Sequence, residues 1–343
     1  MAYSINAKDH FNTKLYTGTG SAPNAITGVG FQPDFLWIKP RNLANSHRLH
    51  STLLTATDYY VMSENTDAEA TNDNCVTSFD TDGFTLGNTD NGWNGSYNYV
   101  SWNWKAGGAG STNNDGSTAS TVSANTNSGF SMVTHSGTGG ATTIGHGLGV
   151  SPKIVISKRR NSANPWAFQQ NIVGGSWTSN NYLILNTTAA VASSSALVNN
   201  VSSSTISFAG ADDWVNASGS TYIHYVFAEK TGFSKFGSYT GNGNADGVFI
   251  YTGFKPGFLL IKKTSGTEAW VLVDSKRPAY NYTNKYVLAN DYAVEAQGLV
   301  YELLSNGFKF NDTSQNISGT TYFYMAFAEA PLVGTNDVPC VAR

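Results

Sequence analysis

Three glycine-rich pentapeptides are the first candidates for a chemical site in this sequence. They are YTGTG at residues 16–20, HSGTG at 135–139 and YTGNG at 239–243. A glycine loop binds phosphate where it leads from a strand into a helix, because the free N–H groups and the dipole of the helix then face the anion. Here the glycines lead into short turn and strand sequences, without a nearby Gly-Lys-Ser or Gly-Lys-Thr. The sequence therefore predicts tight backbone turns, which glycine tolerates at positive φ, and no phosphate site.

Two groups of side chains could bind a metal ion. His47 and His50 in HRLH could supply two ligands, but no third ligand lies nearby. Asp80 and Asp82 in FDTDGF, with Asp90 beyond them, resemble a fragment of a calcium loop. Related segments further along the chain carry tryptophans and a plain hairpin turn at these places, so we expect no metal and no cofactor.

Carboxylates and serines give little support for an enzyme. No Gly-x-Ser-x-Gly motif occurs, and no Ser, His and Asp set recurs at matching positions. Glu229 and Glu329 could cleave a glycan if they were held about 5–9 Å apart. They occupy equivalent ends of two related strands, which favours a structural role. We therefore predict that the protein is not an enzyme.

Two loops have the composition of a sugar-binding surface. Trp93 and Asn94 lie in NGWNGS, and Asp213, Trp214 and Asn216 lie in DDWVNAS. An indole face stacks on the apolar side of a sugar while amides and carboxylates bind its hydroxyl groups. These five residues are the candidate glycan contacts. The alternative is that the tryptophans fix their loops to the body of the domain.

The glycine motif belongs to a repeat that spans the chain. A proline follows the first motif glycine after 15 residues and a lysine follows the proline after six, in all three copies. These positions are Gly18, Gly137 and Gly241; Pro33, Pro152 and Pro256; and Lys39, Lys158 and Lys262. Each copy closes with an aromatic strand, YVSWNWKA, YIHYVFAE or YFYMAFAE. The chain therefore contains three diverged copies of one domain of about 100 residues.

The repeats predict an all-β protein. Each contains short runs with alternating hydrophobicity separated by Gly, Asn, Asp and Ser turns, which favours three tandem antiparallel β-sandwiches of jelly-roll or immunoglobulin-like kind. The expected boundaries are 1–106, 129–231 and 232–330 for the sandwiches, 107–128 for a Gly/Ser/Thr/Asn-rich linker and 331–343 for a C-terminal tail. The linker has almost no large side chains, so it is either a free connection or an arm laid on a neighbour.

The closing strands predict which faces are buried. One face is apolar in every copy, as at Trp102, Tyr225 and Met325, so it should be core. The other face changes from polar, at Ser101, to apolar, at Tyr324, so it should be wetter in the first copy and meet another domain or subunit in the third. Because only KTG joins copies 2 and 3, those two should form a rigid pair and the first should move more freely.

Composition excludes several classes of partner. Charged residues make up 13% of the 343 residues and the formal charge is −3, so we expect neither nucleic acid nor an anionic membrane as a partner. No apolar run approaches the roughly 18 residues of a membrane span. Cys75 and Cys340 are too few for a disulfide framework. The start, MAYSINAKDH, does not resemble a secretory signal, so we expect synthesis in a cytoplasm.

Three segments resemble proteins of tailed bacteriophages, many of them marine. They are DGSTASTVSANTNSGFSMVTHSGTG, VNASGSTYIHYVFAEKTGFSKFGSYTGNG and TGFKPGFLLIKK, and the likeness extends from about residue 9 to Arg343. Members of this group carry repeated β domains and are described as tail-fibre or virion-associated proteins. The resemblance implies a place on the virion, contacts with other virion proteins and no catalytic set.

The function that follows is a bacteriophage structural protein of the tail fibre or receptor-binding kind. It would adhere to the host surface, with glycan as the expected ligand, and a homotrimer would strengthen weak single contacts. The alternative is a capsid-decoration or tail-connector protein with a purely architectural role. A glycan depolymerase is a more remote third reading.

Overall fold

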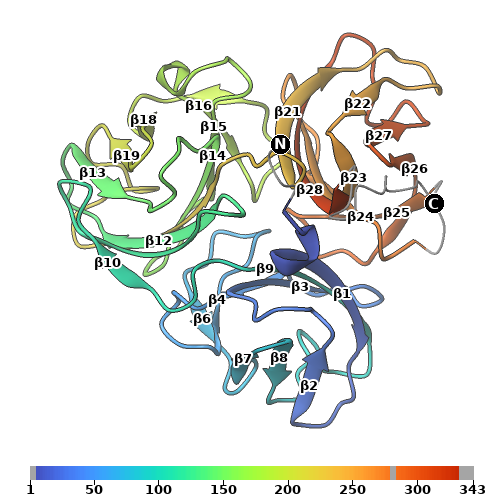
Figure 1. Ribbon diagram of the computed structural model, residues 1–343, viewed down its shortest axis with the longest axis horizontal. Coiled ribbons are helices and arrows are strands. Elements are labelled where there is room, and N and C mark those ends of the chain that lie inside the picture. Colours follow the sequence, from blue (N-terminus) through green and yellow to red (C-terminus); the bar gives the residue numbers. More distant parts are fainter. Residues whose placement is uncertain (1–4, 279–282, 332–343) are drawn as a thin grey trace.

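Antiparallel strands form nearly all of the regular structure in residues 5–278 and 283–331, which the computed structural model describes. Figure 1 shows three lobes around a common centre, with repeat 1 in blue, repeat 2 in green and repeat 3 in orange. The prediction of an all-β chain of antiparallel β-sandwich domains is confirmed. The predicted tail, apart from Pro331, and Cys340 lie outside the described residues.

The elements follow one another in the same order in each repeat. Repeat 1 contains η1 (Ala7–Asp9), β1 (Phe11–Thr17), β2 (Asn24–Thr27), β3 (Phe35–Pro40), β4 (Arg48–Ser51), β5 (Tyr59–Tyr60), β6 (Ala70–Thr71), β7 (Ser78–Asp80), β8 (Gly83–Leu86) and β9 (Asn98–Trp104). Repeat 2, with the segment before it, contains β10 (Ser111–Asn113), β11 (Ser120–Asn125), β12 (Phe130–Ser136), β13 (Thr142–Gly145), β14 (Ile154–Arg159), β15 (Ala167–Gln170), η2 (Trp177–Ser179), β16 (Asn181–Ile184), β17 (Ala192–Ser193), β18 (Val198–Val201), β19 (Thr205–Phe208) and β20 (Thr221–Phe227). Repeat 3 contains β21 (Ser234–Thr240), β22 (Phe249–Tyr251), β23 (Phe254–Lys263), β24 (Val271–Asp274), β25 (Thr283–Leu288), β26 (Ala296–Leu304), β27 (Gly307–Phe310) and β28 (Thr321–Pro331).

Each sandwich has a large sheet and a small one. In repeat 1 the orders are β1-β9-β3-β4 and β2-β8-β7, with a separate β5-β6 pair. In repeat 2 they are β10-β11-β12-β20-β14-β15-β16-β17 and β13-β19-β18. In repeat 3 the two sheets are continuous, in the order β21-β28-β23-β24-β25-β26-β27-β22. The closing strand lies beside the first strand in every case, in matching registers: Tyr16 opposite Tyr99, His135 opposite Tyr222, and Tyr239 opposite Tyr322.

The segment 107–128 is not a free linker, which corrects that domain assignment. It forms β10 and β11, and β11 pairs with β12 of repeat 2, with Val122 opposite Val133. The alternative of an arm laid on a neighbour describes it correctly. Its small side chains allow this close contact, since a Cβ on Gly116 would lie 2.6 Å from the Cα of Ile144. We call residues 107–128 the arm.

The apolar face of the closing strands is buried between the repeats, not inside each sandwich. Trp102, Tyr225 and Met325 belong to one hydrophobic cluster to which all three repeats contribute. The opposite face fills the sandwich interiors, so Ser101 is fully buried and Tyr324 contacts Phe308 of its own repeat. The expectations of a wetter face in repeat 1 and an external contact in repeat 3 are therefore wrong. The face that meets the other repeats stays apolar because it packs against the same face of its two counterparts in every repeat. The opposite face packs only within its own sandwich, so its residues can differ from one repeat to the next.

The shared cluster also shows that repeat 1 is packed as closely as the other two. Its Phe11 ring contacts Phe258 and Phe327 of repeat 3 at 5.7 and 5.5 Å between centroids, and its Phe35 ring contacts Tyr225 of repeat 2 at 4.6 Å. The expectation of a separate rigid pair formed by repeats 2 and 3 is not met. All three repeats meet around one centre.

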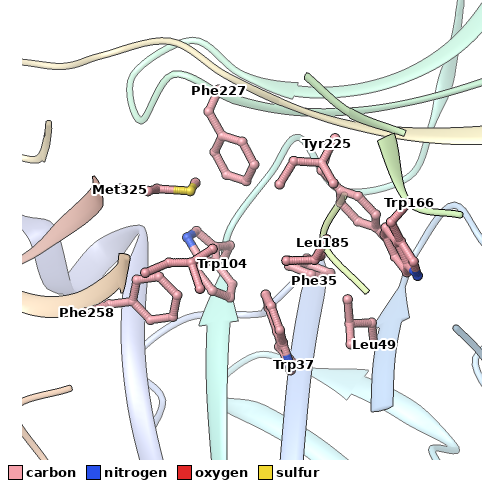
Figure 2. Close-up of a pocket in the computed structure, with 12 residues that line it drawn as sticks. Phe35, Trp37, Leu49, Trp104, Trp166, Leu185, Tyr225, Phe227, Phe258 and Met325 are labelled. Carbon is pink, nitrogen blue, oxygen red and sulfur yellow. The ribbon is translucent and has the colours of Figure 1, made fainter. Parts of the chain in front are cut away.

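Only a small space remains at this centre. Figure 2 shows side chains from the three repeats converging on it, among them Trp104, Phe227 and Phe258. Its volume of about 20 Å³ has room for about one water molecule. The centre is therefore a packed core and offers no ligand cavity.

The glycine motifs are backbone turns, as predicted, and no helix follows any of them. A Cβ on the first glycine would lie within 2.0–2.3 Å of a carbonyl oxygen of the loop before the closing strand: Gly18 with Gly95 O, Gly137 with Ala217 O, Gly241 with Ile317 O. The later glycine has a positive φ of 62°, 72° or 74°, at Gly20, Gly139 and Gly243. The first position thus requires glycine for close approach and the second for its conformation.

We expect Gly137→Ala to destabilise the protein by about 2 kcal/mol or more, because the new methyl group would overlap the carbonyl of Ala217. Gly140→Ala is the matched control, since nothing lies within 4 Å of a Cβ there. Urea denaturation of both variants measures the difference. Equal midpoints for the two variants would contradict this account of the motif.

Candidate functional site

Two of the five predicted glycan contacts are buried side chains that hold the glycine turns in place by hydrogen bonds. Asn94 and Asn216 are fully buried and, with Asn316 of repeat 3, occupy equivalent places beside the glycine turns. Each side-chain oxygen accepts a backbone N–H bond from the turn, from Thr19 or Thr138 at 3.0 and 2.9 Å in the first two repeats. Each amide nitrogen donates to a turn carbonyl. Because these hydrogen bonds use the amides fully, they are not available to a sugar.

Trp93 is also internal, with 1% of its surface exposed. Its indole Nε1 donates to His50 Nε2 at 2.7 Å, and its ring packs edge-on against Tyr60 at 5.1 Å. The guanidinium of Arg48 lies 4.9 Å from the ring centroid, a cation–π contact. The alternative reading, that the tryptophan fixes its loop, is the one that holds for Trp93.

Trp214 and Asp213 remain at the surface. Trp214 is half-buried and meets Tyr182 edge-on at 5.6 Å, while the Asp213 side chain is 72% exposed and forms an ion pair with Arg159 at 3.3 Å. The structure therefore does not bring the five residues together as one surface. The burial of Trp93, Asn94 and Asn216 could not be predicted from the composition of their loops. Tryptophan and asparagine occur both as buried residues that stabilise a loop and as residues that contact a sugar.

His47 and His50 are buried and neutral. His47 Nδ1 accepts from Trp37 Nε1 at 2.8 Å, so its Nε2 carries the proton and donates to Leu288 O of repeat 3 at 3.0 Å. Burial lowers the pKa of His47 and of His50 to about 3 in each case. Both rings have their hydrogen bonds within the protein and serve as structural residues.

The aspartates that resemble a calcium loop do not converge. Asp82 accepts N–H bonds from Gly28 and Gly30 at 2.9 and 2.6 Å, Asp80 accepts from Thr85, and Asp90 accepts from the backbone N–H of Gly92. Each carboxylate closes its own turn. Within residues 5–278 and 283–331, no three His, Cys, Asp or Glu side chains are placed to hold one metal ion.

Glu229 and Glu329 are each neutralised by lysines. Glu229 pairs with Lys153 at 2.7 Å and Lys235 at 3.4 Å, and Glu329 pairs with Lys255 at 2.9 Å. Each glutamate therefore forms ion pairs at its own strand end, as expected of a structural role.

The repeated lysines lie at the interfaces between repeats, a role that the sequence did not reveal. All three are fully buried, and burial lowers the pKa of each to about 8. Each Nζ donates to a backbone carbonyl of the preceding repeat around the ring: Lys39 to Tyr292 O at 3.2 Å, Lys158 to Thr66 O at 2.8 Å, and Lys262 to Thr188 O at 3.2 Å. Three similar contacts thus close the chain into a ring.

A ring N–H makes a second contact across each interface. Trp166 Nε1 donates to Met62 O at 2.8 Å and Trp270 Nε1 donates to Ile184 O at 3.0 Å. His47 makes the corresponding bond to Leu288 O in the third interface. His47 therefore occupies the position of Trp166 and Trp270 and has the same structural role, which accounts for this histidine without a metal ion.

Two interfaces add a bidentate ion pair. Arg41 pairs with Glu295 at 2.9 and 3.0 Å, and Arg160 pairs with Glu69 at 2.6 and 3.1 Å. The third interface has Thr264 in this place, whose carbonyl still accepts from Val191 N at 2.9 Å. Planar guanidinium–carboxylate pairs fix both distance and orientation.

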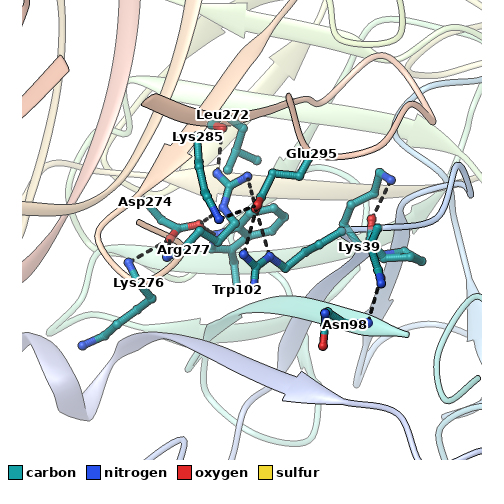
Figure 3. A network of polar contacts seen from close by, with 12 residues as sticks. Lys39, Asn98, Trp102, Leu272, Asp274, Lys276, Arg277, Lys285 and Glu295 are labelled. Carbon is teal, nitrogen blue, oxygen red and sulfur yellow. Dashed lines mark hydrogen bonds and ion pairs between the residues drawn. The ribbon is translucent and has the colours of Figure 1, made fainter. Parts of the chain in front are cut away.

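Figure 3 shows a polar network between repeats 1 and 3. Asp274 accepts from Trp102 Nε1 at 3.0 Å and from Arg277 Nε at 2.6 Å. The side chains of Asp274 and Arg277 are fully buried, and the guanidinium lies 5.4 Å from the Trp102 ring centroid. The Asp274–Arg277 pair is therefore enclosed within the interface, whereas Lys276 and Lys285 at the margin of the network are 38% and 30% exposed.

Exposed apolar side chains gather in repeat 3. Of the six large apolar or aromatic side chains exposed within the described residues, five belong to this repeat: Phe249, Tyr251, Tyr292, Val294 and Ile317. Phe249 and Tyr251, exposed by 48% and 58%, lie on the edge strand β22. The residues at these places are Ala25 and Thr27 in β2 and Thr143 and Gly145 in β13. Aligning the three strands would have found this difference in the sequence.

Comparison with known proteins gives a family without a known activity. The family described as Domain of unknown function (DUF7483) matches residues 6–331. The chain belongs to this family. The matched residues include all three repeats, which together form the shared hydrophobic cluster. No curated protein and no solved structure matches the chain. In the described part of this DUF7483 chain, no helix is long and apolar enough to cross a membrane.

We expect Trp93→Ala to reduce the free energy of unfolding by about 3–5 kcal/mol, because it opens a cavity and removes the hydrogen bond to His50. Trp214→Ala, the matched control, should cost clearly less, because the ring is half-buried. Thermal and urea unfolding measure both. A small effect of Trp93→Ala would indicate an accessible binding residue instead.

Acid should destabilise the protein. Burial lowers the pKa of all six histidines, to about 3 for His47 and His50 and about 4 for His135. The unfolded chain therefore binds more protons below pH 6.5, and stability falls as the pH drops from 6.5 towards 4. At pH 4.5 a histidine with a folded pKa of 3 contributes a loss of about 2–3 kcal/mol.

The measurement is urea unfolding between pH 7.5 and 4.5, with NMR titration of the imidazole signals. Asp34, Glu64 and Glu268, whose pKa values are raised by burial, oppose the loss in the lower part of the range. A His47 or His50 signal that titrates near pH 6.5 in the folded protein would refute the prediction.

Proposed function

We propose that the protein is a structural protein of a bacteriophage virion, a tail-fibre or receptor-binding protein that attaches to the host surface through repeat 3. The observation that carries the proposal is the asymmetry of the surface: of the six large apolar or aromatic side chains exposed in the described part of the chain, repeat 3 carries five. Single apolar side chains at a surface are common, whereas a concentration on one unit of a repeated structure indicates a contact site. The sequence resemblance to virion proteins supports a location on the virion.

The proposal replaces the predicted glycan residues with a different surface. Trp93, Asn94 and Asn216 are internal, and Asp213 and Trp214 form only a small exposed group in repeat 2. Phe249 and Tyr251 take their place as the residues with which binding should be tested first. Because the three repeats already close around one centre, the proposed attachment unit does not need a homotrimer to be rigid.

A purely architectural role, as a capsid-decoration or tail-connector protein, is the second candidate. The arm favours it, because the arm shows that sheet edges in this fold accept an added extended segment. A depolymerase receives no support from Glu229 and Glu329, since lysines pair with both carboxylates.

The test compares binding of the full chain to bacterial envelope fractions with that of a double variant, Phe249→Ser with Tyr251→Ser. We expect at least a tenfold loss of binding. Val150→Ser, which changes the exposed large apolar residue that lies outside repeat 3 among residues 5–278 and 283–331, should bind like the unaltered chain. Absence of binding to every envelope fraction, together with phage adsorption that antibodies to the protein leave unchanged, would refute the proposal. Immunogold labelling on the capsid instead of the tail would favour the second candidate.

A further inference from the structure

The arm shows how one small-sheet edge is covered in this fold. Along β13, the N–H of Thr118 donates to Thr143 O at 3.0 Å, and the N–H of Thr143 donates to Ser117 Oγ at 3.0 Å. Thr118 and Ile144 form a parallel β-bridge. The outer edge of the repeat 2 small sheet is therefore paired with an extended, parallel segment of the chain.

The equivalent edge of repeat 3 has no such cover among the described residues. Ile250 pairs with Phe308 as Ile144 pairs with Ile206, so Phe249 stands where Thr143 stands. The N–H and C=O groups of Phe249 therefore point away from β27, towards the outside of the sheet. β22 is the last strand of its sheet in the part of the chain that the structure describes.

Repeat 3 has no arm of its own ahead of it. β20 ends at Phe227 and β21 begins at Ser234, whereas β9 and β12 are separated by residues 105–129. A short connection cannot reach along β22. Among the described residues, the connection into repeat 3 therefore supplies no segment that could cover β22.

The side chains beside the edge differ from those of repeat 2 in a way that specifies the partner. A Cβ on Gly145 would lie only 1.5 Å from Asn113 Oδ1, so in repeat 2 the arm occupies the place that the Tyr251 side chain takes in repeat 3. A Cβ on Gly307 would lie 2.8 Å from the Phe249 ring, and a Cβ on Gly253 would lie 3.5 Å from the Tyr251 hydroxyl oxygen. Both rings thus rest on backbone and leave apolar surface exposed. Because the Tyr251 ring fills the place of Asn113, an occupant of this edge needs apolar side chains that can pack on the exposed faces of Phe249 and Tyr251.

We propose that the outer edge of β22 binds an extended segment of another polypeptide, which adds to the sheet as a parallel strand and packs apolar side chains on Phe249 and Tyr251. Main-chain hydrogen bonds give such strand addition its affinity, and alternate side chains give its specificity. An unpaired edge flanked by exposed aromatic rings is otherwise a risk for aggregation. The inference rests on the proposed function only in treating repeat 3 as the contact surface.

The edge of repeat 1 provides an internal comparison. β2 is also the last strand of its sheet in the described residues, but Ala25 and Thr27 flank it in place of the aromatic residues. Its backbone can pair, yet it offers no apolar surface to a partner. Strand addition should therefore favour β22 over β2.

The test uses the full chain and an eight-residue peptide of alternating sequence, SVTVSVTV, with a control peptide in which proline replaces the two central valines. NMR-detected hydrogen exchange and fluorescence anisotropy measure binding. We expect the alternating peptide to slow exchange of the Phe249 and Tyr251 amides at least tenfold and to leave the Ala25 amide unchanged. The proline-containing peptide should bind at least tenfold more weakly.

Three variants locate the contact. Phe249→Pro removes the outward N–H group, and Tyr251→Gly introduces the repeat 2 residue and removes the ring; each should weaken peptide binding at least tenfold. Ala25→Pro on β2 is the matched edge control and should leave binding unchanged. Circular dichroism and the unfolding midpoint check that the variants fold, and Tyr251→Gly keeps the test valid if Phe249→Pro does not.

The proposal is overturned if saturating peptide leaves the Phe249 and Tyr251 amides unprotected. It is also overturned if oligosaccharides such as chitotetraose protect this surface in place of the peptide, or if the chain forms dimers on sedimentation that Phe249→Pro abolishes. Failure of the envelope-binding test alone would refute the attachment role and leave strand addition standing. Failure of the peptide test alone would refute strand addition and leave the attachment role standing.

Discussion

Burial of one apolar face of β9, β20 and β28 against its two counterparts is the constraint on which the rest of the molecule depends. Trp102, Trp104, Tyr225, Phe227, Met325 and Phe327 come from strands far apart in the sequence and belong to one hydrophobic cluster. A sandwich of about 100 residues buries a limited core on its own, so sharing one core among three adds apolar burial without lengthening any repeat. This arrangement also leaves each interior free to vary. It explains why the sandwich interiors differ more between repeats than the surfaces that join them.

Buried polar contacts give this apolar association its geometry. A hydrophobic face alone does not fix the rotation of one sandwich against the next, because apolar burial is not directional. The lysine and ring N–H contacts recur at all three interfaces and always reach carbonyls of the preceding repeat. A buried ammonium is costly unless hydrogen-bonded. A repeat placed at another angle would remove the acceptor that Lys39, Lys158 or Lys262 finds in the preceding repeat, so these residues favour one arrangement.

The divergence of the repeats indicates where the molecule meets its surroundings. Residues that face the common centre or the interfaces remain similar in kind, whereas β2, β13 and β22 carry different side chains on the same backbone. In repeat 2 the arm fills this edge, and in repeat 3 two exposed aromatic rings stand there. A repeated fold can thus keep its shared core and its interfaces similar while the edges of its sheets take on separate roles. The proposed attachment surface lies at the edge where the departure from the other two repeats is greatest.

The sequence by itself determined the three repeats, their all-β character and the structural role of the glycine turns. Each of these follows from local chemistry, since alternation specifies a strand and a motif such as YTGTG requires glycine whatever lies around it. Only the tertiary structure decided what the repeated lysines bind, which face of the closing strands is shared, and that Trp93 and Asn94 are internal while Phe249 and Tyr251 are exposed. These properties depend on which surfaces meet. An apolar stripe or a tryptophan in a loop looks the same in a sequence whether its partner is the same sandwich, the next repeat or water, because burial is a property of the assembled chain.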